Sequence, residues 1–196
     1  MRHAQTADTA AGRVSDDPTV PLSAAGHAAA MGLAHALHGC AAEALVCSPM
    51  MRARQTAHPV AEALGLRTVL IPALAERRMG ALAGFSRAQL RAGPHAAALT
   101  AWDDAPPQGE SLRAVGLRAS RALAALPALP VLLVITHAGV IRALVGALDG
   151  TPTAARGCID VPFATVLRRE LAPDAMAKLW AHLAEGAAPH GAEAPR

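Results

Sequence analysis

The chain has 196 residues, of which 53% are hydrophobic and 17% are charged, so it is long and apolar enough to bury a core and is not a disordered tail. Aromatic residues make up only 2% of it, which argues against a base-stacking surface for single-stranded nucleic acid or RNA. The formal net charge is +3, but the positive residues are spread along the chain and Lys178 is the only lysine. Arginine's planar fork suits small oxyanions better than general polyanions, so we expect no nucleic-acid partner.

The cysteines and the first residues indicate the compartment. Cys40, Cys47 and Cys158 form no CxxC pair and leave one over in any pairing, which favours a reducing interior over a disulfide framework. No stretch reaches the length of a membrane span, and residues 1–6 lack the apolar core of a signal peptide. We therefore expect a cytoplasmic protein with no membrane partner.

Helices alternate with short apolar strands along the chain. The patterns predict strands over 44–47, 68–71, 131–135 and 163–171. They predict helices over 22–37, 48–64, near 86–91, and over 110–126, 140–148 and 174–183. Ser23 and Ser48 are the predicted N-caps of the first two helices. This alternation predicts an α/β fold, a three-layer α/β/α sandwich around a mostly parallel sheet. We expect one domain over residues 1–185 and a disordered tail over 186–196.

Motifs for nucleotide loops, serine-hydrolase elbows and zincin sites are absent from the sequence. His35, His38 and Cys40 lie close together, but no second group of ligands accompanies them at a suitable spacing. We interpret these three residues as a solvated helix end, and we expect neither a metal nor a cofactor.

Arginine and histidine recur where elements of the predicted sheet meet the next segment. Arg2 and His3 open the chain, Arg52 lies in the first turn after the 44–47 strand, and His137 follows the 131–135 strand. Groups at the carboxyl ends of parallel strands line a ligand crevice, so these four side chains would form an electropositive pocket for a phosphoryl group. An imidazole in such a pocket can act as a nucleophile.

Six segments, in order, resemble motifs of the histidine phosphatase (phosphoglycerate mutase-like) superfamily. RHAQT at 2–6 is similar to RHG-x-T, PLSAAG at 21–26 to PLT-x-x-G, SPMMRARQTA at 48–57 to SPLxRARQTA, ERRMG at 76–80 to E-x-x-x-G, GES at 109–111 to GES, and THAGVIR at 136–142 to SHGGVIR. Each motif has an ordinary structural reading by itself; Glu76, for example, could be a solvated ion pair beside Arg77 and Arg78. Their joint occurrence in family order favours the resemblance.

The resemblance implies a role for each matching residue. His3 would be the phosphorylated nucleophile, and Arg2, Arg52 and His137 would complete the phosphate pocket and stabilise charge on the transferring group. Glu76 would protonate the leaving oxygen and then activate water. No metal or cofactor is required by these roles.

Two departures from the family pattern matter. An apolar strand precedes the RHG motif in the family, whereas only Met1 precedes Arg2 here. We therefore expect a truncated first strand, unpaired backbone on its neighbours and a poorly anchored His3, and we hypothesise that the functional protein has further N-terminal residues. Thr9 stands where the family often has a phosphate-binding asparagine, so it is a candidate phosphate ligand.

The substrate is inferred from the segment after the acidic motif. Family mutases carry a long insertion there with paired arginines for a carboxylate, whereas residues 85–109 are short and supply only Arg87 and Arg91. We therefore expect a phosphatase that takes small phosphorylated metabolites, with a phosphoglycerate mutase as the alternative. A catalytically inactive binding or regulatory module is the alternative from another class, and the sequence leaves a homodimer open.

Overall fold

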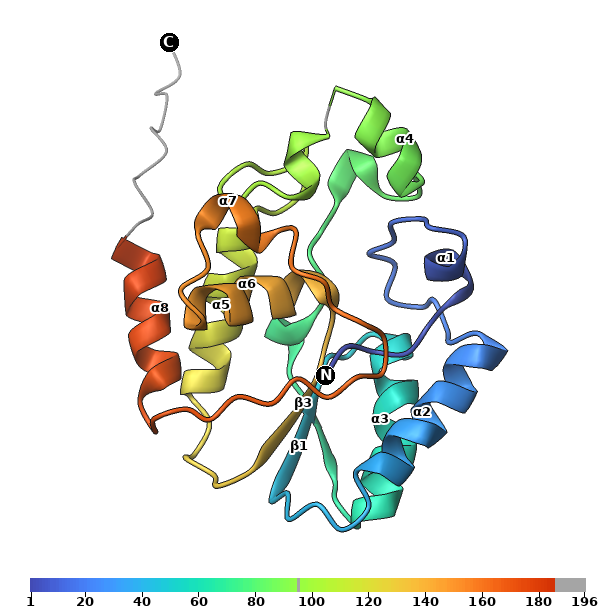
Figure 1. Cartoon of the computed structure of the whole chain (residues 1–196), viewed down its shortest axis with the longest axis vertical. Coiled ribbons are helices and arrows are strands. Elements are labelled where there is room, and N and C mark those ends of the chain that lie inside the picture. Colours follow the sequence, from blue (N-terminus) through green and yellow to red (C-terminus); the bar gives the residue numbers. More distant parts are fainter. Residues whose placement is uncertain (95, 186–196) are drawn as a thin grey trace.

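A parallel sheet lies at the centre of the chain. The computed structural model describes residues 1–94 and 96–185, and its sheet has the order β2 (Thr68–Leu70), β1 (Ala44–Cys47), β3 (Leu132–Ile135). Leu45 pairs with Thr68 on one side and with Leu133 on the other, all strands running parallel. The predicted α/β class and mostly parallel sheet are confirmed (Figure 1).

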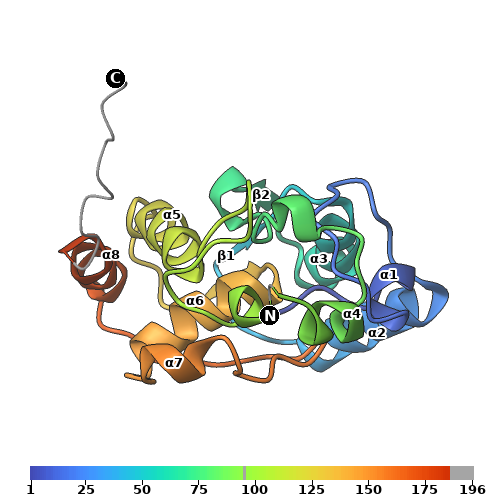
Figure 2. The ribbon, with the colours of Figure 1, turned by 90° about the horizontal axis from the view of Figure 1, so that it is seen from above.

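Helices cover both faces of this sheet, as the alternation of side chains along β1 requires. Leu45 and Cys47 pack against α2 (Ala24–Ala36) and α3 (Met51–Leu64). Val46 faces the other way, into a cluster from α5 (Leu112–Ala124), α6 (Ala138–Leu148) and α8 (Ala175–Glu185). Figure 2 shows α2 and α3 on one side of the molecule and α5, α6 and α8 on the other. These are the three layers expected from the sequence.

Residues 1–3 extend the sheet beyond β3. The amide of Thr136 donates to the carbonyl of Met1 (2.9 Å), and the amide of His3 donates back to the carbonyl of Thr136 (2.9 Å), as in a parallel ladder. On the far side of this segment, the amide of Ala164 donates to the carbonyl of Arg2 (3.1 Å). The expectation of unpaired neighbours and a poorly anchored His3 is therefore wrong, because three residues suffice to fix the backbone on both sides.

The predicted strand over 163–171 is also wrong. Ala164 has a φ of 47°, in the left-handed region, which interrupts an extended run at its second residue. The segment that follows has no regular structure and exposes Arg168 and Glu170. Leu167 packs against a core cluster, and Arg168 pairs with Glu170 at the surface, without any ladder of strand hydrogen bonds to the described residues.

The remaining helices are short and surround the carboxyl ends of the strands. They are α1 (Ala7–Ala10), α4 (Arg87–Ala92) and α7 (Thr153–Arg156), with 3₁₀ turns at Pro72–Leu74, Gly80–Leu82 and Ala97–Leu99. Ser23 caps α2 as predicted, and Ser86 forms a capping box with Gln89 in α4. α3 begins at Met51 and has no side-chain cap, so the prediction that Ser48 caps it is wrong.

α2 holds the segment that follows His3. The amide of Ser23 donates to the carbonyl of Gln5 (2.9 Å), and a Cβ at Gly26 would overlap that same carbonyl oxygen. Glycine in the family-like PLSAAG segment is therefore needed for close approach of the helix to the backbone. The N-terminal motif is clamped between this helix and β3.

Two absences concern only the residues that the structure describes. In residues 1–94 and 96–185, no helix has both the length and the apolar character for crossing a membrane. Within the same ranges, no group of three or more His, Cys, Asp or Glu side chains is placed to hold a metal ion. The predicted tail over 186–196 lies outside the described residues, and a single domain over 1–185 stays a prediction.

Candidate active site

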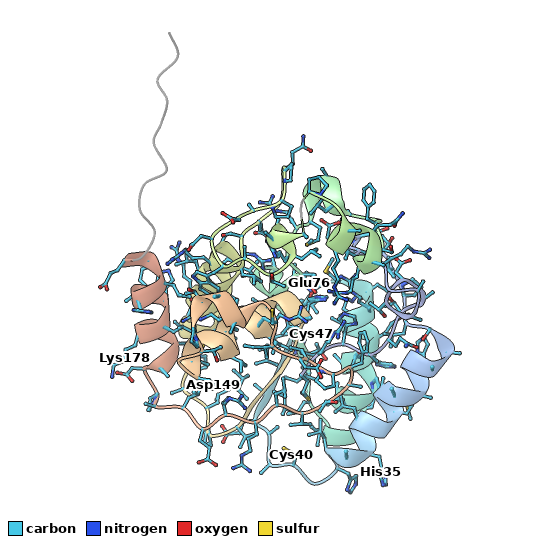
Figure 3. All side chains as sticks on the ribbon, turned by 45° about the horizontal axis from the view of Figure 1, so that its top comes forward. His35, Cys40, Cys47, Glu76, Asp149 and Lys178 are labelled. Carbon is cyan, nitrogen blue, oxygen red and sulfur yellow. The ribbon has the colours of Figure 1, made fainter. Side chains whose placement is uncertain are left out.

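The predicted site residues meet at the carboxyl ends of the strands. One cavity there is lined by the side chains Arg2, His3, Thr9, Arg52 and Glu76. Figure 3 labels Glu76, which lies near the middle of that view. His137 lies behind the cavity wall, with its ring centroid 5.0 Å from that of His3.

His3 presents one ring nitrogen to the cavity. Its Nδ1 lies 2.7 Å from the carbonyl oxygen of Ala4, and a carbonyl only accepts, so Nδ1 carries the proton and Nε2 keeps its lone pair. Only 2% of the residue is exposed. Burial lowers the pKa of His3 well below 6.5; repulsion by a protonated His137 ring and the charge of Arg52 would each lower it further. His3 is therefore a neutral imidazole with a lone pair available at neutral pH.

His137 is held by a serine that the sequence assigned to another role. Its Nε2 lies 2.7 Å from the hydroxyl oxygen of Ser48, which also accepts from the amide of Met50 (3.3 Å). Nδ1 of His137 is buried and has no partner in the described part of the chain. Burial, with the charge of Arg52, lowers the pKa of His137 well below 6.5. A serine proton donated to Nε2 would place the ring's own proton on Nδ1, the nitrogen that has no described partner.

Arg2 and Arg52 bring positive charge to the same place from two elements. The Arg2 guanidinium donates to the carbonyl of Val161 (2.7 Å) and stacks 3.5 Å from the ring centroid of Phe163, while its buried Nε has no described partner. Burial lowers the pKa of Arg2 to about 10. Arg52, 3% exposed, donates to the carbonyls of Asp17 (2.8 Å) and Ser15 (3.3 Å). Burial lowers its pKa too, so both cations would gain from a bound anion.

Glu76 is fixed by backbone amides and not by a cation. Its Oε1 accepts from the amide of Gly139 at the start of α6 (3.0 Å) and from the amide of Arg77 (2.9 Å). The alternative of a solvated ion pair is wrong, because Arg77 is buried and Arg78 pairs with Glu110. Oε2 has no recorded hydrogen bond among the described residues, which leaves it free for proton transfer.

The loop that carries Glu76 depends on residues whose structural role the sequence did not reveal. Arg77 donates to four backbone carbonyls, those of Ala98, Leu99, Asp104 and Glu110. Ser111 caps α5, and the carboxylate of Glu110 accepts from Arg118 (3.1 Å) and from the amide of Arg78 (3.0 Å). These contacts join segments that are far apart in the sequence, so sequence patterns did not predict them. The motif GES was the one signal that marked Glu110.

Thr9 lines the cavity, but its hydroxyl group has another partner. It donates to the carbonyl of Thr6 (3.0 Å) and accepts from the amide of Thr6 (2.8 Å), forming the capping box of α1. A phosphate ligand would have to replace that bond. Thr9 therefore lines the cavity, but its hydroxyl proton is already donated and is not available to an anion.

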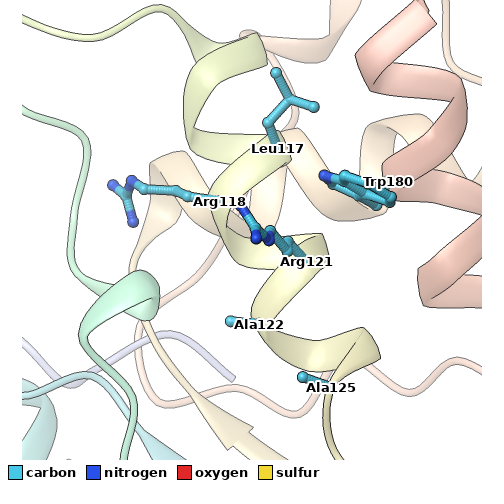
Figure 4. A pocket seen from close by; sticks show the side chains of 6 residues that line it. All are labelled: Leu117, Arg118, Arg121, Ala122, Ala125 and Trp180. Carbon is cyan, nitrogen blue, oxygen red and sulfur yellow. The ribbon is translucent and has the colours of Figure 1, made fainter.

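A second depression lies outside the sheet, between α5 and α8. Figure 4 shows Trp180 of α8 beside Leu117 of α5, with Arg118 pointing away from it. The lining is Leu117, Arg118, Arg121, Ala122, Ala125 and Trp180. It offers no acid, base or nucleophile, so the chemistry belongs to the cavity beside His3.

Comparison with known proteins shows the family of this chain. The sequence model of the histidine phosphatase superfamily (branch 1) matches residues 1–182. The adenosylcobalamin/alpha-ribazole phosphatase of Escherichia coli (strain K12) is 31% identical, over 79% of this chain and 80% of its own length. A 2,3-bisphosphoglycerate-dependent phosphoglycerate mutase of Methylobacterium radiotolerans is 33% identical, over 70% of this chain and 71% of its own.

Solved structures show the same fold. A mycobacterial glucosyl-3-phosphoglycerate phosphatase in complex with VO3 superposes with a TM-score of 0.72 at 28% identity, over 81% of this chain and 84% of its own. A putative alpha-ribazole-5'-P phosphatase from Escherichia coli superposes with a TM-score of 0.70 at 29% identity, over 84% and 85%. The chain belongs to the histidine phosphatase superfamily and is a phosphoric monoester hydrolase.

Proposed function

We propose that His3 is the nucleophile with which this phosphatase hydrolyses small phosphomonoesters. The observation that carries the proposal is the neutral, buried imidazole, whose Nδ1–H is held by a carbonyl while Nε2 faces the cavity. A histidine fixed in this tautomer keeps its lone pair in one direction, which is what in-line attack on phosphorus needs.

The reaction would proceed in two displacements. Nε2 of His3 attacks phosphorus, the bond from phosphorus to the ester oxygen breaks, and Glu76 gives its proton to the leaving alcohol. Water then attacks the phosphohistidine, Glu76 takes the proton from that water, and the N–P bond breaks to release inorganic phosphate. The two steps together restore His3 and Glu76 to their starting protonation states, and only the ester and one water are consumed.

Arg2, Arg52 and His137 would hold the equatorial oxygens of the transferring phosphoryl group. Two guanidiniums supply the positive charge that a metal ion provides in other phosphatases, and we therefore propose a metal-independent reaction. Thr9 would join them only by releasing Thr6. The cytoplasm is the compartment we propose, in keeping with three free cysteines. A homodimer stays a prediction that sedimentation would test.

The first test is hydrolysis of p-nitrophenyl phosphate with EDTA present. We expect activity in the wild type and in His58→Ala, a control at an exposed histidine, and none in His3→Ala. Acid-labile phosphate trapped on residue 3 and identified by mass spectrometry would locate the intermediate. Equal activity in His3→Ala would disprove the proposal, and activity lost on adding EDTA would disprove its metal independence.

Glu76→Gln separates the two displacements. p-Nitrophenol leaves without help from an acid, so the variant should release one equivalent in a burst and then turn over about 10²-fold or more slowly, because water lacks its base. The wild type should show no such slow second phase. A variant with unchanged steady turnover would show that another group is the base.

A phosphoglycerate mutase activity is the second candidate, favoured by the 33% identity to the Methylobacterium radiotolerans mutase. It would appear as interconversion of 2- and 3-phosphoglycerate that depends on a bisphosphoglycerate primer. Net release of inorganic phosphate without interconversion favours the phosphatase. An inactive binding module would give neither product.

A further inference from the structure

Arginines line the cavity beside His3 in greater number than one phosphoryl group can use. The lining arginines are Arg2, Arg13, Arg52, Arg77, Arg87 and Arg142. Glu76 is the one carboxylate among the described residues that line it. Such an excess of positive charge in a partly buried space is unfavourable until an anion enters.

Four of these arginines already have a partner or a role. Arg77 donates to backbone carbonyls through all three of its nitrogens, and Arg13 pairs with Asp8 at 3.2 Å. Arg2 and Arg52 are assigned to the transferring phosphoryl group. The charge that remains to be explained is that of Arg87 and Arg142.

Arg87 and Arg142 reach the cavity from different elements. Arg87 is the first residue of α4, and its guanidinium has no hydrogen bond or ion pair recorded within residues 1–94 and 96–185. Arg142 lies in the second turn of α6 and donates through Nε to the carbonyl of Ile159 (2.8 Å), so its two terminal nitrogens stay available. In Figure 1, α4 lies above the N-terminal segment, and the side chains of Arg87, Arg142 and His3 meet in the lining of one cavity.

The two guanidiniums line the same cavity, so their like charges oppose each other. Burial lowers the pKa of Arg142, and the charge of Arg87 is the next largest cause. Both cations also oppose the charge of Arg2. Glu76 inside the cavity attracts Arg2 and Arg142, and the exposed carboxylate of Asp160 attracts them from outside the cavity lining. A neighbouring anion would relieve this repulsion and occupy planar forks suited to its oxygens.

We propose that Arg87 and Arg142 form a second anion site, so that the preferred substrate is a phosphomonoester carrying a further carboxylate or phosphate group. The proposal rests on the function proposed above, with the scissile phosphate at His3. The second anion would sit in the same cavity, toward α4 and α6. Substrates whose leaving group is neutral would leave these two cations unpaired and bind less tightly.

Matched substrates test the charge alone. 3-Phosphoglycerate and glycerol 1-phosphate differ by a carboxylate in place of a hydroxymethyl group, and 1,3-propanediol bisphosphate differs from its monophosphate by the second phosphate. In at least one pair, we expect kcat/KM for phosphate release to be about tenfold or more higher for the substrate with two anionic groups. The bisphosphate has two equivalent phosphate esters, so its kcat/KM is halved before the comparison. The pair with the larger ratio identifies carboxylate or phosphate as the second group.

Arg87→Gln should reduce that ratio about tenfold, because it removes a cation without a recorded structural partner. Arg91→Gln is the matched control: Arg91 lies on the same helix, is exposed and does not line the cavity, so the ratio should stay as in the wild type. Ratios near one in the wild type for both pairs, or a ratio unchanged in Arg87→Gln, would overturn the proposal.

Binding to His3→Ala keeps this test separate from the proposed chemistry. Calorimetry on that variant should show tighter binding of 3-phosphoglycerate than of glycerol 1-phosphate, or of the bisphosphate than of the monophosphate, without any turnover. Equal affinities within both pairs would refute the second anion site even if the wild type hydrolyses p-nitrophenyl phosphate. Absence of His3-dependent hydrolysis, with the affinity difference retained, would instead refute the proposed mechanism alone.

Discussion

Acid should destabilise this fold because two imidazoles are buried in their neutral form. His3 is 2% exposed and His137 is fully buried, and burial lowers the pKa of each well below 6.5. In the unfolded chain each ring takes up a proton near its ordinary pKa, so proton binding favours unfolding. The free energy of unfolding is therefore highest above 6.5 and falls as the pH drops from 6.5 toward the folded pKa values.

The contribution of His3 can be worked out from this linkage. A ring that titrates at 6.5 when unfolded and stays neutral when folded loses about 1.4 kcal/mol of stability between about pH 7.5 and pH 5.5. His3→Gln keeps a neutral polar side chain and removes the titration. The wild type should thus lose about 1.4 kcal/mol more over this interval than the variant does.

Urea unfolding followed by circular dichroism at the two pH values measures this double difference. The carboxyl groups whose pKa is lowered, such as those of Glu110 and Asp149, stay ionised above about pH 5.5 in both states and contribute little. The buried amino group of Met1, whose pKa is lowered to about 6, is common to both proteins and cancels. Phosphate is left out of the buffer. An equal loss of stability in both proteins would refute the neutral, buried state of His3.

Three further substitutions test the supports of the site. Gly26→Ala should lower the melting temperature, because the new Cβ would overlap the backbone carbonyl of Gln5. Gly32→Ala in the same helix is the control: its Cβ meets nothing, and it should stabilise the protein by up to about 1 kcal/mol. Thermal scans that rank the two variants in the opposite order would contradict the close packing of α2 on residue 5. Glu110→Gln should lower the free energy of unfolding by about 1–3 kcal/mol in urea titrations, since it breaks an ion pair that is mostly buried; a change within error would count against it. Ser48→Ala leaves Nε2 of His137 without its hydrogen-bond partner and should lower kcat about tenfold with a smaller change in KM. An unchanged kcat would show that the Ser48–His137 hydrogen bond does not support catalysis.

The fold was largely predictable because its elements carry local signals. The strand over 44–47 has an unbroken apolar run and was predicted at its observed bounds, and Ser23 before α2 has the polar side chain that an N-cap needs. The strand over 163–171 failed because one left-handed residue, Ala164, decides the backbone there, and alanine gives no sign of it. Three-residue pairing at the N-terminus was missed because it depends on partners more than 130 residues away.

The candidate site was predictable as a set of residues and not as a set of contacts. The order of the motifs predicted His3, Glu76 and His137 as site residues, and in the structure they lie at one edge of the sheet. Ser48 was assigned to a helix cap because a serine before a proline is typical of one, yet its hydroxyl pairs with His137. The roles of Arg77 and Arg142 required the three-dimensional structure, because an arginine's partners are set by tertiary contacts and not by its neighbours in sequence.

The pairing of residues 1–3 with the end of β3 has a consequence for folding. Such a contact closes a loop of more than 130 residues, so we expect it to form after the helices and the inner strands have drawn the chain together. In refolding from urea, helical circular dichroism should therefore return before enzymatic activity does, because the proposed nucleophile lies on this late-forming segment.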